Sequence, residues 1–218
     1  MPDLSFQVLG TECGTRGLIP LLYFRLRIAS TRADEKIASI ILRTQIQLEP
    51  GQRSYNHAEK ERLGEIFGTS DRWGQTLRNK LWAHVDLSVP AFVGQTEVRL
   101  PVPCSYDLNV LSAKYFQALE GGDVALLFLF SGTVFHLNTE DRLQVHQISW
   151  EKECRYTMPA EMWRSLMEEF YPQSAWLTLR RDVFDRVYTY KRQHGFSGWD
   201  ETLEHLLAAK EVTVEVQA

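Results

Sequence analysis

Residues 124–135 read Val-Ala-Leu-Leu-Phe-Leu-Phe-Ser-Gly-Thr-Val-Phe and give the strongest strand signal in the chain. The first seven are all apolar, and a short apolar run that follows the turn pair Gly121-Gly122 is typical of a buried strand. A strand that is apolar on both faces is expected at the centre of a sheet, covered on both sides. Residues 143–148 are predicted to pair with it through a turn at residues 138–141.

Two earlier stretches, residues 22–28 and 38–48, alternate apolar and polar side chains. A period of two predicts strands with one face on a core. Because the polar residues 30–36 between them suit a turn, we expect the two strands to form a hairpin on an antiparallel sheet. The polar face of that hairpin would be either a solvated surface or a patch for anions or an acidic partner, and it would carry Arg25, Arg27 and Arg43.

Helical signals lie in the middle and in the last third of the chain. Asn56 can cap a helix, since Glu59 stands three residues later in the position of a capping box. Pro159 suits the first turn of another helix. Apolar residues then recur at helical spacing up to a stop at Gly195, and a final helix is expected after Ser197.

These patterns predict an α+β fold. An antiparallel, sandwich-like β-sheet region forms the first two-thirds, and a C-terminal segment of three helices packs on it. The predicted domains are residues 1–157, which are β-rich with inserted helices, and residues 158–218, which are helical and expected to pack on the same domain. No Gly-, Ser- or Pro-rich linker separates the two parts.

Composition narrows the class of protein. Of the 218 residues, 44 % are hydrophobic and 24 % are charged, which is ordinary for a chain that buries a core. The formal net charge of −4 argues against broad binding of nucleic acid, which needs a basic surface. The longest apolar run, residues 124–130, is too short to span a membrane. Three widely spaced cysteines and an N-terminus without an export signal favour a cytoplasmic protein.

No complete catalytic, cofactor or metal signature is present, so we expect no cofactor and no metal. The cysteines lack the close spacing of structural zinc ligands, although His136 and His146 could meet across the predicted 124–148 hairpin. One alternative stays open. Cys104, with His84 and Asp107, could line a pocket of a small-molecule binding protein or an unrecognised enzyme.

Aromatic residues crowd the second half of the chain. Tyrosine and tryptophan are common at binding hot spots, but they also fill cores. We therefore weigh core packing against a shared groove between the sheet and the C-terminal helices. The residues predicted to line such a groove are Tyr106, Tyr115, Trp150 and Trp176, together with Asp107 beside Tyr106.

Several strings resemble an uncharacterised bacterial family, largely actinobacterial, and the resemblance spans almost the whole chain. They are residues 4–8 (Leu-Ser-Phe-Gln-Val), 24–28 (Phe-Arg-Leu-Arg-Ile), 72–74 (Arg-Trp-Gly), 101–107 (Pro-Val-Pro-Cys-Ser-Tyr-Asp), 113–116 (Ala-Lys-Tyr-Phe) and 130–135 (Phe-Ser-Gly-Thr-Val-Phe). Genes of that family often lie beside genes for [NiFe]-hydrogenases. The resemblance implies an accessory or assembly partner of such an enzyme, with hydrogenase subunits or maturation factors as partners, and it brings no catalytic residues.

Overall fold

The computed structural model describes residues 2–14, 17–107 and 110–215, with side chains as far as Ala208. The chain divides after Trp176 into two compact units. We call Met1–Trp176 unit 1 and Leu177–Ala218 unit 2, and we describe each by itself.

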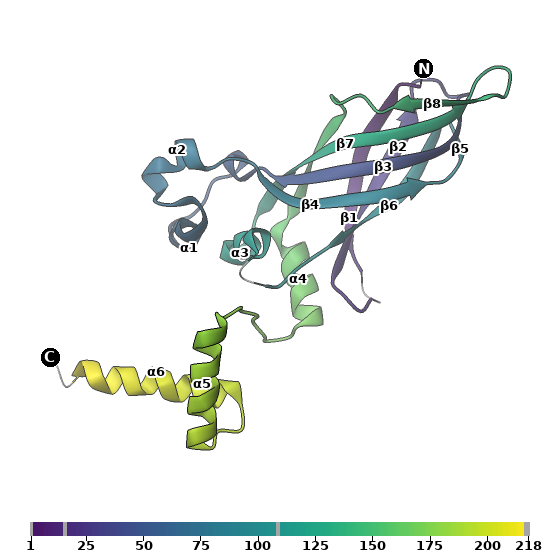
Figure 1. Cartoon of the computed structure of the whole chain (residues 1–218). Helices are drawn as coiled ribbons and strands as arrows, with labels where there is room; N and C mark the ends of the chain where they lie inside the picture. The colour runs from purple at the N-terminus through teal and green to yellow at the C-terminus, as the bar shows by residue number, and fades with distance from the viewer. Residues whose placement is uncertain (1, 15–16, 108–109, 216–218) are drawn as a thin grey trace. The chain divides into compact units, whose positions relative to one another are not determined.

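Unit 1 is built on two antiparallel sheets, which lie one behind the other in Figure 1. Sheet A has the order β1-β2-β6, with β1 at Leu4–Cys13, β2 at Leu21–Ser30 and β6 at Gln95–Pro103. Sheet B has the order β4-β3-β7-β8, with β4 at Lys80–Val89, β3 at Lys36–Leu48, β7 at Asp123–Leu137 and β8 at Leu143–Gln147. The short β5 (Phe92–Val93) pairs with β3, and β9 (Glu153–Pro159) pairs with β7.

The inner faces of the two sheets form the core. The alternating residues of β2 that the sequence predicted to be apolar and inward are fully buried, as are their counterparts on β3 from Ile40 onward. Ala38 is only partly buried, because the register of β3 shifts between Ile37 and Ser39. Aromatic rings join the layers: Phe24 of β2 meets Phe128 of β7 edge-on at 5.1 Å between ring centroids, and Phe6 of β1 stacks on Phe130 at 4.3 Å. The predicted α+β class with a sandwich-like β region is thereby confirmed.

The predicted hairpin between β2 and β3 is wrong. β2 pairs with β1 and β6, whereas β3 pairs with β4, β5 and β7, so the two strands lie in different sheets. The reason is that each of the two strands buries one face, which is mostly apolar. When the strands lie in opposite sheets, these two faces pack toward each other and both are removed from water. Consequently the predicted arginine row does not exist. Arg27 pairs with Glu97 at 2.8 Å on sheet A, while Arg43 pairs with Asp86 at 3.0 Å on sheet B.

The central place of β7 is confirmed. One edge pairs with β3, and the other pairs first with β9 and then with β8. The change of partner falls at Gly132, whose carbonyl accepts from the amide of Ile148 at 2.9 Å. Gly132 has φ +135, and a Cβ there would lie 2.0 Å from the carbonyl oxygen of Ile41. Only glycine therefore fits where β3 passes this point.

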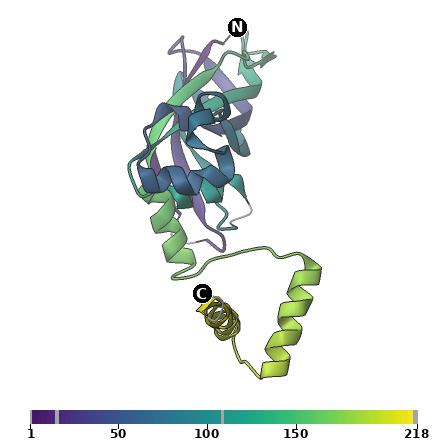
Figure 2. The ribbon, with the colours of Figure 1, turned by 90° about the vertical axis from the view of Figure 1, so that its left-hand side faces the viewer.

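Helices cover one end of the two sheets (Figure 2). They are α1 (His57–Phe67), α2 (Trp73–Thr76), α3 (Leu111–Ala118) and the 3₁₀ turns at Pro50–Gln52 and Ser70–Arg72, while α4 (Ala160–Phe170) follows β9. The capping box of Asn56 and Glu59 is present as predicted. Glu59 also forms a buried ion pair with Arg53 at 2.9 Å, and Arg53 donates to the carbonyls of Gly121 and Asp123. This network ties α1 to the start of β7.

Unit 2 is a pair of helices, α5 (Arg181–His194) and α6 (Trp199–Glu215). Gly195, in the left-handed conformation, ends α5 as predicted. The helices meet through Trp199, whose ring lies 5.4 Å from that of Phe184 and 6.1 Å from that of Tyr188.

The observed division differs in place from the expected boundary near residue 157. Helix α4 belongs with the sheets of unit 1, because its side chains Trp163, Leu166 and Met167 are part of the same buried cluster. The packing of the remaining two helices on the sheets stays a prediction. Within the described residues, no helix combines the length and the apolar character needed to cross a membrane.

We predict that Gly132→Ala strongly destabilises unit 1. The new methyl group meets the backbone of β3, and the positive φ adds strain, so the free energy of unfolding should fall by about 3 kcal/mol or more. Gly64→Ala in α1 is the control. Its Cβ would meet nothing within 4 Å, and the change should stabilise the helix by about 0.5–1 kcal/mol. Urea unfolding at pH 7.5 measures both, and equal stabilities for the two variants would contradict the register described here.

Candidate functional site

An aromatic cluster lies where the chain leaves unit 1. Tyr106 follows β6, and its ring is parallel to that of Tyr171, at the end of α4, with centroids 5.8 Å apart. Tyr171 in turn contacts Trp176 at 4.8 Å, and Trp163 lies 5.9 Å from Tyr106. Asp107 pairs with Trp176 in an isolated β-bridge. The structure therefore brings three of the predicted binding residues together, namely Tyr106, Asp107 and Trp176.

Trp176 is the accessible member of this cluster. Its side chain is 50 % exposed, whereas Tyr106 is only partly exposed and packs against the hydrophobic core. Binding hot spots often contain an aromatic ring that packs against other side chains on one face and is exposed to solvent on the other. We call Tyr106, Tyr171 and Trp176 the aromatic cluster.

The other two predicted binding residues lie elsewhere. Tyr115 on α3 is 1 % exposed, and its hydroxyl lies 2.9 Å from that of Tyr55. Burial raises the pKa of Tyr115, which thus stays a neutral core residue. Trp150 lies in the loop between β8 and β9 and is 90 % exposed. Neither joins the aromatic cluster, and a binding role for any of the five stays a prediction.

A second apolar surface runs along α6. Trp199, Leu203 and Leu207 are spaced four residues apart, so they share one face of the helix, and all three are exposed. Thr202 is buried, and its hydroxyl donates to the carbonyl of Gly198 at 2.7 Å. We call Trp199, Leu203 and Leu207 the α6 stripe. The sequence predicted these residues to be the apolar side of a helix, but it gave no reason to treat them as a site.

The residues of the proposed cysteine pocket do not converge. Cys104 follows β6 and is part of the hydrophobic core, and burial raises the pKa of its thiol to about 12. His84 is exposed on β4, where the next residue, Val85, faces the core. Because successive side chains of a strand point to opposite faces, His84 faces away from the core that holds Cys104.

The two histidines predicted to meet across the β7–β8 hairpin do so. The rings of His136 and His146 stack with centroids 4.9 Å apart. His136 is buried, and neither of its ring nitrogens has a hydrogen-bond partner. Burial first, and then the neighbouring His146, lower the pKa of His136, while Glu35 acts in the opposite direction. In the described part of the chain, no three His, Cys, Asp or Glu side chains group as metal ligands would.

The architecture is that of an α+β sandwich protein with an added helical pair and apolar surfaces. Residues 1–215 match the model of a family described as "Family of unknown function (DUF6084)", and the chain belongs to this family. No curated protein matches it.

Two solved structures are similar in part. One is the solution structure of a putative late embryogenesis abundant protein, with 10 % identity, a TM-score of 0.28, and coverage of 73 % of this chain and 72 % of the other. The second is β-glucosidase 3B from Thermotoga neapolitana in complex with α-D-glucose, with 11 % identity, a TM-score of 0.25, and coverage of 72 % and 17 %. At these TM-scores neither similarity bears on function.

We predict that Cys104 does not react with iodoacetamide in the folded protein at pH 8. Its buried thiol is protonated there, and the thiolate is the reactive form. Mass spectrometry of tryptic peptides, with and without 6 M guanidinium chloride as an unfolded control, measures the labelling. Rapid labelling of Cys104 without denaturant would revive the cysteine-pocket hypothesis.

We predict a loss of stability on mild acidification that depends on His136. Its pKa in the folded state lies below the ordinary value of about 6.5, so the unfolded chain binds more protons once the pH falls below that value. The free energy of unfolding should therefore decline from pH 7.5 to pH 5.5, and it should decline less in His136→Leu. Urea unfolding at both pH values tests this, and equal declines in the two proteins would count against it.

Proposed function

We propose that this chain is a non-enzymatic accessory or assembly factor that works by binding another protein. The observation that carries the proposal is the α6 stripe, in which Trp199, Leu203 and Leu207 present 40 %, 42 % and 66 % of their surface to solvent. Apolar residues at spacing i, i+4 and i+8 are the anchors by which a helix lies in an apolar groove of a partner.

The packing of unit 2 supports this role. In its described part, as far as Ala208, neither α5 nor α6 has a fully buried apolar side chain. Several of its large apolar side chains are exposed, Tyr188 of α5 among them. A partner that covers them would supply the missing burial and order the pair.

The aromatic cluster offers a second contact for the same partner. Trp176 ends unit 1, and the cluster supports its exposed ring directly before unit 2 begins. Contacts at both places would make the attachment bivalent, which raises affinity without further contact area.

The first partners to test are the subunits and maturation factors of a [NiFe]-hydrogenase, on the strength of the family resemblance. In this proposal the protein acts in the cytoplasm, binds no nucleic acid and needs no cofactor. The alternative is a small-molecule binding protein or an unrecognised enzyme with a pocket near Cys104, and the burial of Cys104 and the outward position of His84 do not favour it. A thermal-shift screen of metabolites would test it, because a ligand of the native state must raise the melting temperature.

We predict that Leu203→Glu weakens capture of the partner by about tenfold or more, since a buried hot-spot side chain is replaced by a charge. Leu81→Glu is the control, because Leu81 is similarly exposed, at 50 %, but lies on β4. The tagged full chain and both variants are purified from the native host, and bound proteins are quantified by mass spectrometry.

The expected result is that hydrogenase subunits or maturation factors accompany the parent chain and Leu81→Glu, but not Leu203→Glu. Equal recovery with both variants would exclude the α6 stripe as the contact. Purification of the parent chain alone under all growth conditions would contradict the proposed function.

A further inference from the structure

The outer edge of β8 is open for hydrogen bonding. Along two antiparallel strands, residue pairs that exchange hydrogen bonds alternate with pairs that do not. At one end of the β7–β8 pair the amide of Ile148 donates to the carbonyl of Gly132, and at the other end the amide of Asn138 donates to the carbonyl of Arg142. The alternation between these ends places the backbone groups of Gln144 and His146 toward β7. The N–H and C=O groups of Leu143, Val145 and Gln147 then point away from β7, along the free edge.

This edge is short, but it lacks the chemical protection against pairing that many edge strands carry. Natural edge strands are shielded by charged side chains, proline or bulges. β8 reads Leu-Gln-Val-His-Gln and contains no charge and no proline, and its pairing with β7 has no register shift. Leu143 and Val145 are each more than half exposed, opposite Leu137 and Phe135 of β7. The outer face beside the free edge is therefore apolar.

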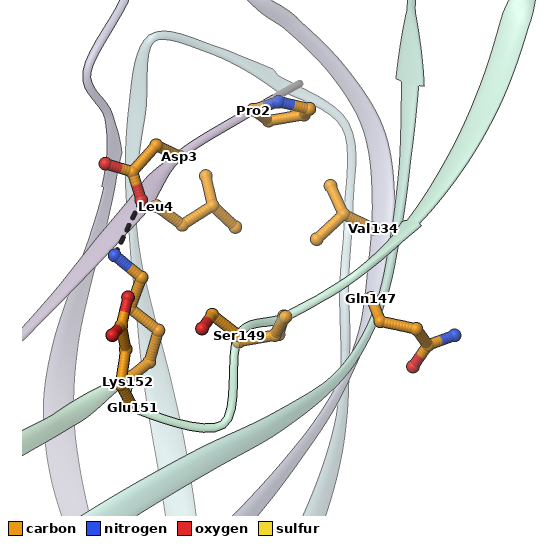
Figure 3. Close-up of a pocket in the computed structure, with 9 residues that line it drawn as sticks. Pro2, Asp3, Leu4, Val134, Gln147, Ser149, Glu151 and Lys152 are labelled. Atoms are coloured by element: carbon orange, nitrogen blue, oxygen red, sulfur yellow. Dashed lines mark hydrogen bonds and ion pairs between the residues drawn. The ribbon is translucent and has the colours of Figure 1, made fainter.

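A cavity of about 330 Å³ lies beside the same edge (Figure 3). Leu4 of β1 and Val134 of β7 face each other across it, and Ser149 closes it below. Lys152 borders it and forms an ion pair with Asp3 at 2.6 Å. The cavity thus lies at the seam between the two sheets, and its lining is part apolar and part polar, with room for a large side chain whose apolar part would contact Leu4 and Val134.

Charged side chains form part of the lining of the cavity. Glu151 belongs to the lining, and it has no ion-pair partner among the described residues. Among the described lining residues, the two carboxylates of Asp3 and Glu151 outnumber the one ammonium group, that of Lys152, which favours a basic group on a ligand.

We propose that β8 accepts an extended segment of a partner protein as an additional strand, with one apolar side chain in the cavity and a basic residue near Glu151. In such strand addition the backbone bonds supply affinity, and pockets for alternate side chains supply specificity. The neighbouring side chains of the segment would lie on the outer face, against Leu143 and Val145. The inference rests on the proposed function as a protein-binding factor, and it names a second contact and the chemistry of the segment that fits it.

The test uses a fluorescein-labelled peptide, Lys-Thr-Val-Thr-Leu-Thr-Val-Thr-Lys, and the full chain. Its alternation suits one apolar face, and lysine at both ends meets Glu151 in either strand direction. Binding is measured by fluorescence anisotropy. Val145→Pro removes a backbone donor that does not bond to β7, and we expect it to weaken binding by about tenfold or more. Val145→Thr keeps the donor and the shape of the side chain and is the matched control.

A second measurement guards against misfolding of Val145→Pro. The same peptide with every internal backbone nitrogen methylated cannot donate to a neighbouring strand from either edge, and it should not bind the unaltered chain. Glu151→Gln should weaken binding of the lysine-containing peptide. No binding by the parent chain, or equal binding by Val145→Pro and the parent chain, would overturn the proposal. So would a dimer of the chain in sedimentation velocity that Val145→Pro dissociates, since the occupant would then be a second copy.

The outcome is separable from that of the proposed function. If Leu203→Glu loses the hydrogenase partners and no peptide binds at β8, only the strand-addition proposal is contradicted. If the peptide binds at β8 but the chain retains no partner through α6, only the proposed role of the α6 stripe is contradicted.

Discussion

Burial of the inner faces of sheets A and B against each other is the constraint on which unit 1 depends. β2 presents an apolar side chain at every second position, β3 does so except at Thr44, and neither strand could leave that face in water. Placing them in opposite layers buries both and puts the aromatic rings of β7 between the sheets. The outer faces are left to ion pairs and exposed apolar residues, and the outer edge of β8 is left open.

The helical end of unit 1 follows from a second, polar constraint. Glu59 is almost completely buried, and it is satisfied by Arg53, by the amide of Asn56 and by the amide of Glu120. Removing either charge of the Arg53–Glu59 pair would leave the other buried without a partner, which is far more costly than losing an exposed ion pair. The same arginine contacts the residues that lead into β7, so α1 and α3 are held against the start of the central strand.

Local structure could be predicted from the sequence because its causes are local. The capping box at Asn56, the stop at Gly195 and the central strand of residues 124–135 all follow from neighbouring residues, and all are present. The pairing of β7 with β8 could also be predicted, since a short turn joins them, but the partners of β2 and β3 could not, because a period of two specifies which face is buried and not which strand lies alongside. The burial of individual aromatic residues could not be predicted from the sequence either. Tyr115 and Trp150 are equally plausible binding residues by type, yet one lies in the core and the other in solvent.

Hydrogen exchange on the full chain, alone and in complex with its purified partner, tests the central claim most directly. The account holds that the partner covers the exposed apolar face of unit 2, so amides of α5 and α6 should exchange quickly in the free protein and slow down on binding. The strands of the core should change little. A bound partner that leaves the exchange of residues 181–208 unchanged, while slowing exchange only elsewhere in the chain, would contradict the account.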